Sequence, residues 1–132
     1  MSMKVLIVDP DWRFAEQATE FLESHAHNVV HLNGSHEALD RAGHWKPDLV
    51  IVACEAAKDG LLEHLAALPG RPAVLLTGWA DRFDRAWKAW QRGGDELLMK
   101  PMFSVQELHA GIVSALENAA AGTRRSKLAA TA

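Results

Sequence analysis

Residues 5–11 of the chain have the sequence Val5-Leu6-Ile7-Val8-Asp9-Pro10-Asp11. The stretch begins as an unbroken apolar run and stops at an Asp-Pro-Asp turn. A continuous apolar run is typical of a short strand that is covered on both faces, as in a parallel sheet, whereas a half-exposed strand alternates apolar and polar residues. Further runs of this kind follow along the chain, at residues 28–32, 49–52, 73–76 and, more weakly, 97–99.

Stretches with a helical spacing of apolar residues separate these runs. Asp11 is placed to cap the first predicted helix, because a side-chain oxygen there accepts from a free backbone N–H of the first turn. By the same reasoning, Ser35 caps a short second helix that Gly43 ends, and Asp59 caps the third. Residues 104–107, Ser-Val-Gln-Glu, form a capping box at the start of the fifth helix.

The predicted elements therefore alternate between strand and helix along the whole chain. Because a strand–helix–strand connection is right-handed, this order predicts an α/β fold with one open, doubly wound, five-stranded parallel sheet and helices on both faces. In such sheets, ligands bind at the carboxyl ends of the strands, near the point where the strand order reverses.

The composition is that of one ordinary globular domain, with 132 residues, 48% hydrophobic and 23% charged. The single cysteine, Cys54, excludes an internal disulfide framework and favours a cytoplasmic location. A formal net charge of −3 argues against nucleic acid as a partner, and no apolar run approaches the about 20 residues that cross a membrane. We expect the domain to occupy residues 1–121, followed by a flexible basic tail at residues 122–132.

Polar side chains stand at three of the predicted strand ends: Asp9 after the first strand, Thr77 after the fourth and Lys100 after the fifth. Parallel strands end at the same edge of the sheet, so we expect these groups to converge. Together they suit a phosphoryl group, because carboxylates hold Mg²⁺, an ammonium neutralises phosphate oxygens and a hydroxyl donates to one of them. The structural alternative is that Thr77 merely ends a strand and that Lys100 forms an ion pair with Asp9.

At these residues the sequence resembles the receiver domain of bacterial response regulators, the CheY-like family. The resemblance covers about residues 3–121. It implies a flavodoxin-like (βα)5 fold and a role in two-component, phosphorelay signal transduction, without enzymatic turnover. Its motifs are Val5-Leu6-Ile7-Val8-Asp9, Pro47-Asp48-Leu49-Val50-Ile51-Val52, Asp59-Gly60, Leu75-Leu76-Thr77-Gly78 and Lys100-Pro101-Met102-Phe103.

The resemblance implies a role for each residue that matches the family pattern. Asp9 matches the first of the family's two acids, and Thr77 matches the switch hydroxyl. Gly78 matches the small residue that leaves the pocket open. Lys100 matches the invariant lysine, and its bond to Pro101 is the family's usual cis-peptide position.

Other positions depart from the family pattern. The second acid falls at Pro10, which has no carboxylate, and Asp11 comes one residue late. The phospho-accepting aspartate falls at Ala53, or at Val52 when the chain is aligned without a gap, so neither alignment yields a carboxylate. The aromatic switch position falls at Leu97.

These departures predict a vestigial phosphorylation pocket. Without a carboxylate at position 53 there is no nucleophile for phosphoryl transfer, and Mg²⁺, which demands near-octahedral oxygen ligands, should bind Asp9 and Asp11 poorly. We therefore interpret the chain as a stand-alone pseudo-receiver that acts through protein contacts and has no resident cofactor. A buried ammonium needs a partner, so we predict that Lys100 lies within salt-bridge distance of Asp9.

Alternative interpretations remain open from the sequence. One is phosphorylation at an atypical acceptor, Glu55 or Asp11, and another is a fixed phospho-mimic in which Glu55 folds back toward Lys100. A solvated Glu55 is the simpler expectation for that residue. A flavodoxin-like small-molecule binder is the remaining class, although no phosphate-cradling loop follows the first strand. The seven histidines do not have the spacing of metal ligands, so we predict no metal site.

Three tryptophans, Trp79, Trp87 and Trp90, are predicted to cluster with Phe83 along one stripe of the fourth helix. Core packing is one interpretation of the stripe, and a partner surface is the other, because tryptophan is enriched at interface hot spots. The family commonly docks partners on the fourth helix, fifth strand and fifth helix, a surface that includes Leu97. The expected partners are a histidine kinase or another receiver, including a second copy of the chain.

Overall fold

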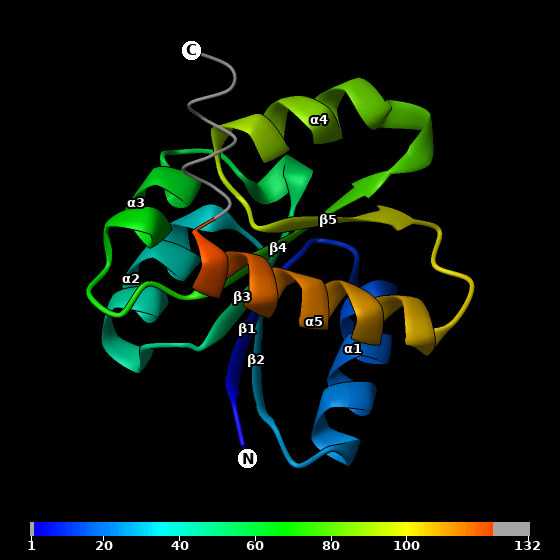
Figure 1. The fold of residues 1–132 in the computed structure, drawn as a ribbon, viewed down its shortest axis with the longest axis horizontal. Helices are drawn as coiled ribbons and strands as arrows, with labels where there is room; N and C mark the ends of the chain where they lie inside the picture. Colours follow the sequence, from blue (N-terminus) through cyan, green and yellow to red (C-terminus); the bar gives the residue numbers. More distant parts are fainter. Residues whose placement is uncertain (1, 123–132) are drawn as a thin grey trace.

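The computed structural model describes residues 2–122 and contains one parallel sheet flanked by helices, which confirms the predicted α/β fold (Figure 1). Each strand follows one of the apolar runs, and a helix follows each strand. In chain order the elements are β1 (Lys4–Val8), α1 (Trp12–Ser24), β2 (Asn28–Leu32), α2 (Ser35–Trp45), β3 (Leu49–Ala53), the 3-10 turn η1 (Cys54–Ala56), α3 (Leu61–Ala67), β4 (Ala73–Trp79), the 3-10 turn η2 (Ala80–Arg82), α4 (Phe83–Arg92), β5 (Glu96–Lys100) and α5 (Val105–Ala121).

The strand order across the sheet is β2-β1-β3-β4-β5, so β2 and β5 form the two edges. The order reverses at β1, which pairs with β2 on one side and with β3 on the other. Connections from β1 and β3 therefore leave toward opposite faces of the sheet, which opens a crevice at the carboxyl ends of these strands. Pairing brings Val8 opposite Val52 and Ala53 opposite Thr77, so the predicted site residues share one edge.

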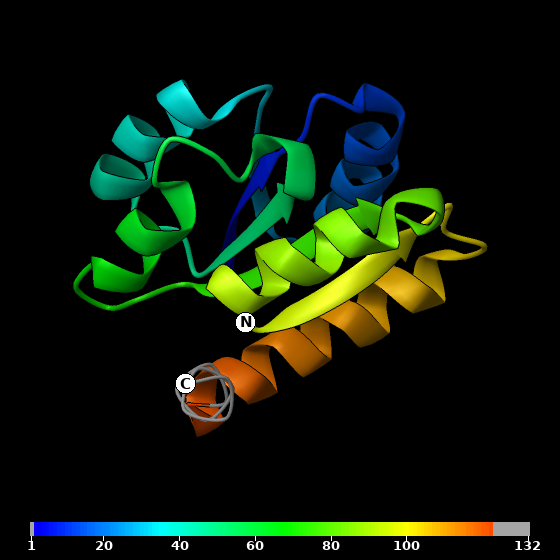
Figure 2. The ribbon, with the colours of Figure 1, turned by 90° about the horizontal axis from the view of Figure 1, so that it is seen from above.

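Helices cover both faces of the sheet (Figure 2), and an apolar core lies on each face. One core packs α2, α3 and α4 against the sheet, and the other packs α1 and α5 against it. Strands β1, β3 and β4 contribute to both cores because their side chains alternate between the faces and are buried on each. This double burial is the reason that their sequences are continuously apolar. Figure 2 also shows the edge strand β5 between α4 and α5.

Helix capping agrees with the sequence at α1 and differs at α2. Asp11 caps α1 as predicted, with its carboxylate accepting from the Phe14 backbone N–H at 3.3 Å. Ser35 does not cap α2, because Gly34 holds the N-cap position and the buried Ser35 hydroxyl donates to the Asp59 carboxylate at 2.8 Å. The helix also runs past Gly43 to Trp45 and ends before Pro47, since the ring of a proline hinders helical conformation in the residue that precedes it.

The starts of α3 and α5 show the same contrast. Gly60 is the N-cap of α3 and Asp59 makes no capping bond, because its carboxylate accepts from Ser35 instead. The capping box of α5 is in place, and the Glu107 carboxylate accepts from the Ser104 backbone N–H at 3.3 Å. The Asp59 prediction is therefore wrong, whereas the capping box is confirmed.

Strands β4 and β5, at the β5 edge of the sheet, are longer than their apolar runs. β4 continues through Thr77 and Gly78 to Trp79 because its pairing with β5 continues to the Trp79–Lys100 pair. Within residues 2–122, no helix is long and apolar enough to cross a membrane. The predicted basic tail lies outside the described residues, apart from Gly122, so the division at residue 121 remains a prediction.

Candidate functional site

An ion cluster lies at the carboxyl end of the sheet and confirms the predicted pairing of Asp9 with Lys100. The Lys100 Nζ atom is 2.8 Å from Asp9 Oδ2 and 3.3 Å from Asp11 Oδ2. Asp9 is fully buried, and Lys100 is only 3% exposed. The ammonium therefore pairs with one carboxylate inside the protein, that of Asp9, and with the partly exposed carboxylate of Asp11.

The topology explains how residues so far apart in the sequence form this cluster. Asp9 follows the central strand β1, and Lys100 ends the edge strand β5, with β3 and β4 between them. The Lys100 ammonium and the Asp9 carboxylate meet at this edge. Thr77, near the end of β4, donates its hydroxyl to Asp9 Oδ2 at 3.5 Å, and the Asp11 backbone N–H donates to Asp9 Oδ1 at 2.8 Å.

Burial dominates the electrostatics of Asp9. Loss of hydration raises the pKa of the Asp9 carboxyl above its ordinary value of 3.8. The hydrogen bond and charge of Lys100 and the Asp11 backbone N–H oppose this effect, whereas the negative charge of Glu55 adds to it. Lys100 is therefore the main group that keeps the buried carboxylate ionised.

The end of β3 carries a methyl group where the family pattern has an aspartate. Ala53 is fully buried and pairs with Thr77 in the sheet, so position 53 lies beside the hydroxyl as the family pattern implies. The structure brings Asp9, Asp11, Thr77 and Lys100 together around this position. No oxygen nucleophile is available from the Ala53 side chain itself.

Gly78 has a packing reason in addition to its predicted place at the pocket. A Cβ added there would lie 2.7 Å from the Cβ of Ala86 and 3.3 Å from the Cys54 sulfur. Only glycine therefore lets α4 approach β4 this closely without a shift in the helix. Gly78 also lines a small cavity with Cys54 and Glu55 at the carboxyl edge.

Glu55 and Cys54 form the turn that follows Ala53. Glu55 is exposed, and no ion pair or hydrogen bond joins it to Lys100 within the described chain. Burial raises the pKa of the Cys54 thiol to about 11, with the charge of Glu55 adding to the effect. The thiol is therefore protonated at neutral pH, which argues against a nucleophilic role, because the thiolate is the reactive form.

Two aromatic rings complete the surroundings of Lys100, and sequence reasoning missed both of them. The Lys100 Nζ atom lies 4.6 Å from the centre of the Phe14 ring and 5.2 Å from that of the Trp79 ring. Cation–π contacts of this kind stabilise a desolvated ammonium. Helical spacing predicted that Trp79 belongs to the fourth helix, and no sequence pattern placed Phe14 beside Lys100. The available signal was the position of Trp79, two residues after Thr77 on the same strand.

The tryptophan cluster differs from the prediction because Trp79 belongs to β4. The aromatic stack of α4 consists of Phe83, Trp87 and Trp90, with ring centres 6.2 Å apart for the first pair and 5.1 Å for the second. Phe83 is 54% and Trp87 is 44% exposed, so the core interpretation is wrong for these two residues. The alanines of α4 take the buried positions against the sheet, since only small side chains fit there.

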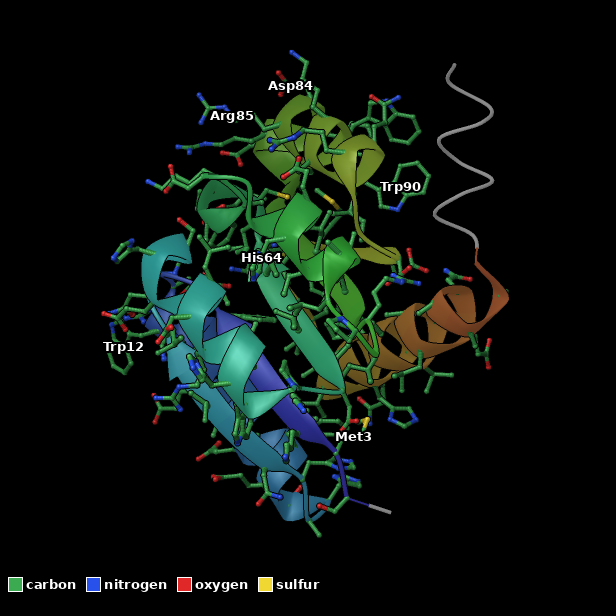
Figure 3. All side chains as sticks on the ribbon, turned by 90° about the vertical axis from the view of Figure 1, so that its left-hand side faces the viewer. Met3, Trp12, His64, Asp84, Arg85 and Trp90 are labelled. Carbon is green, nitrogen blue, oxygen red and sulfur yellow. The ribbon has the colours of Figure 1, made fainter. Side chains whose placement is uncertain are left out.

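Trp90 and Leu97 are the remaining residues of the predicted partner surface. Trp90 and the partly buried Leu97 both pack against the core beneath α4. Trp90 and Arg85 project from opposite sides of α4 (Figure 3). The aromatic stack therefore follows one flank of the helix, and Arg85 lies on the other.

The donor set does not fit the Mg²⁺ that the receiver resemblance implies. Asp9 and Asp11 both bind the Lys100 ammonium, and position 53 supplies no third carboxylate. Mg²⁺ requires oxygen ligands in a near-octahedral arrangement, and a cation between the two carboxylates would compete with Lys100. Within residues 2–122, no group of three or more histidine, cysteine, aspartate or glutamate side chains is placed to hold a metal ion.

Comparison with known proteins places this site in context. No protein-family model matches the chain. The alkaline phosphatase synthesis transcriptional regulatory protein PhoP of Bacillus subtilis (strain 168) is 28% identical over 134 residues, which cover 98% of this chain and 52% of PhoP. The chain thus spans about half the length of this curated relative.

Solved structures share the fold, and two of the three that follow are receiver domains. NtrX from Brucella abortus matches with a TM-score of 0.76 at 22% identity, over 96% of this chain and 30% of NtrX. The receiver domain of the Francisella response regulator 1452 has a TM-score of 0.69 at 21% identity, over 86% of this chain and 96% of that domain. A response regulator receiver domain protein from Clostridium thermocellum has a TM-score of 0.67 at 24% identity, over 86% and 94% of the two chains. The chain therefore has the flavodoxin-like receiver fold.

Proposed function

We propose that this chain is a receiver-fold module of two-component signal transduction that works through protein contacts and is not switched by aspartyl phosphorylation. The fold and the similarity to PhoP support a place among response regulators. The observation that carries the second half of the proposal is Ala53, a buried methyl group beside Thr77 at the end of β3.

Phosphoryl transfer to a receiver needs parts that this site does not offer. An attacking carboxylate must form the new P–O bond, a divalent cation must neutralise the phosphoryl oxygens, and a lysine must be able to contact them. Here the Ala53 side chain has no oxygen, and both Asp9 and Asp11 bind Lys100. The Phe14 and Trp79 rings cover the ammonium further. The site is therefore a structural ion cluster, and we propose no catalytic turnover.

The exposed stack of α4 supports the proposed contact surface, which α4, β5 and α5 form together. Phe83 and Trp87 present large, rigid apolar areas of the kind found at interface hot spots. A second receiver, in the form of another copy of this chain, suits this surface, because a two-fold axis places the exposed Phe83 and Trp87 rings of one α4 against those of the other.

Incubation with acetyl phosphate and Mg²⁺, followed by intact mass measurement, tests the proposed phosphorylation independence. We expect the mass to remain that of the unmodified chain. An adduct of one phosphoryl group would overturn the proposal. Its loss in Glu55→Gln or in Asp11→Asn would then identify the atypical acceptor, and its persistence in both variants would place it elsewhere.

Sedimentation velocity over a range of protein concentrations tests the contact surface. We expect reversible dimers in the unmodified chain and a shift to monomer in Trp87→Gln, which removes the exposed indole. Trp12→Gln is the matched control, because Trp12 is 64% exposed on α1, outside the surface (Figure 3). A monomer at all concentrations, or equal dimerisation of Trp87→Gln and the unmodified chain, would contradict a second copy as the partner.

A further inference from the structure

A cavity of about 170 Å³ opens at the carboxyl end of the sheet, between α1 and the segment that follows β5. Its apolar walls include Phe14, Trp79 and Met102, and its polar groups include Arg13, Gln17 and Lys100. The carboxyl edge of a doubly wound sheet is where ligands of such folds bind. An apolar pocket with a few converging polar groups is also the usual form of a small-molecule site.

The polar groups of the cavity favour an anionic group. Arg13 and Gln17 stand one turn apart on α1, and the side chain of neither forms a hydrogen bond or ion pair among residues 2–122. Lys100, which is 3% exposed, brings no free positive charge to the inner wall, because its ammonium already binds the Asp9 and Asp11 carboxylates. The one acid in the lining, Asp11, accepts from the Phe14 N–H and shares the Lys100 ammonium with Asp9, so among residues 2–122 Arg13 is the cation of the lining that no carboxylate binds.

The rest of the lining favours a flat apolar body attached to that anionic group. The Phe14 and Trp79 rings present aromatic surface, and the thioether of Met102 packs well against aromatic rings. The volume of about 170 Å³ exceeds the need of an inorganic ion alone. We infer that this cavity binds a small aromatic carboxylate, with the carboxylate at Arg13 and the ring against Trp79.

The neighbouring cavity on Trp79 does not suit the same ligand. It measures about 60 Å³ and is lined by Cys54, Glu55, Arg82 and Arg85 as well as Trp79. Its volume is too small for an aromatic ring and its substituent. The negative charge of Glu55 is also part of its lining, and it opposes an incoming carboxylate.

Binding in the larger cavity is coupled by geometry to the ion cluster. Asp11 caps α1 through the Phe14 N–H and binds Lys100 through its other oxygen. Asp11 also lines the cavity, so a carboxylate bound at Arg13 lies beside the group that joins the start of α1 to the ion cluster. This inference goes beyond the proposed signalling function and does not depend on it, because neither Ala53 nor the α4 stack takes part.

Titration with benzoate, followed by two-dimensional ¹H–¹⁵N NMR of the whole chain, tests this inference. We expect saturable shifts of the Trp79 indole signal, which is assigned by its absence in Trp79→Phe. Benzamide, a neutral analogue of nearly the same shape, should bind about ten-fold more weakly because it lacks the charge. Inorganic phosphate should leave the Trp79 signal unchanged.

Two arginine variants locate the site. Arg13→Gln should weaken benzoate binding about five-fold, as expected for a solvent-exposed charge pair. Arg41→Gln, which removes an equally exposed arginine from α2, should leave it unchanged. The inference is overturned if benzoate gives no saturable shift, if benzamide or phosphate binds as well as benzoate, or if the two variants behave alike. A phosphoryl adduct in the mass experiment overturns only the proposed function, so the two failures are distinguishable.

Discussion

The two ends of the sheet each bury an aspartate, and they satisfy its charge in different ways. At the carboxyl end, Asp9 faces Lys100, which is itself almost fully buried. At the opposite end, Asp95 accepts from the Val74 backbone N–H at 2.8 Å and pairs with Arg71, which reaches solvent with 26% of its side chain exposed. One end therefore hides both charges of an ion pair, whereas the other lets the cation keep part of its hydration.

The two clusters also differ in what surrounds them: the Asp95 cluster has only structural contacts, whereas the Asp9 cluster adjoins a cavity. Arg71 also donates to the Ala119 carbonyl at 3.2 Å, and Asn118 donates to the Asp95 carbonyl at 2.8 Å, so the Asp95 cluster fastens the end of α5 to the start of the sheet. The Asp9 cluster lies instead beside a cavity and under two aromatic rings. Buried charge thus has a purely structural use at one end and adjoins a candidate binding site at the other.

Of the changes proposed at the two ends, Lys100→Met should have the largest effect on the free energy of unfolding. It leaves Asp9 buried without a cation, which we expect to lower the free energy of unfolding by about 3 to 5 kcal/mol. Urea denaturation measures the change, with Lys88→Met on the exposed face of α4 as the matched control. The double variant Asp9→Asn/Lys100→Met should be more stable than Lys100→Met, because it removes the unpaired charge. Equal stability of Lys100→Met and the unmodified chain would contradict the proposed ion cluster.

Asp95→Ala should have a smaller effect at the opposite end. The Val74 N–H loses its buried acceptor, for which we expect a loss of about 1 to 3 kcal/mol, while Arg71 can turn toward water. The same urea experiment measures it. Asp95→Asn, which keeps an acceptor oxygen, is the control and should lose less. A larger loss for Asp95→Ala than for Lys100→Met would reverse the distinction between the two ends.

The pH dependence of stability should give the smallest effect. Because burial raises the pKa of Asp9, the folded chain takes up a proton at a pH where the unfolded chain, with a pKa near 3.8, does not. The folded state then binds more protons, so the contribution of Asp9 to the free energy of unfolding rises as the pH falls toward 3.8 and is lost as the pH rises. Unfolding of the unmodified chain and of Asp9→Asn over a pH series measures this. A free energy of unfolding of the unmodified chain that falls on acidification, relative to that of Asp9→Asn, would show the opposite shift.

Particular residues show which features of the site and of the helix ends local sequence patterns can predict. The convergence of Asp9, Thr77 and Lys100 was predictable because each follows a strand, and parallel strands end at one edge. The roles of Ser35 and Asp59 were not, because two side chains 24 residues apart bond each other in place of their helix ends. Local capping rules compare a side chain only with its own backbone and cannot detect a distant partner.

The aromatic residues show the same limit. Helical spacing correctly grouped Phe83, Trp87 and Trp90 on one stripe, but it did not show that the stripe lies on the flank of α4 while alanines face the sheet. That orientation depends on the close approach of α4 to β4 at Gly78, where any side chain would meet Ala86.

The amino-acid sequence alone determined the order of strands and helices, the edge at which the polar groups meet and the methyl group at position 53. These follow from residue type and chain order, which need no knowledge of neighbouring elements. Only the tertiary structure decided that Phe14 and Trp79 cover Lys100, that Asp11 serves both α1 and the ammonium, and that a cavity remains beside them. These features arise where separate elements pack together, and packing is a property of their relative positions in space.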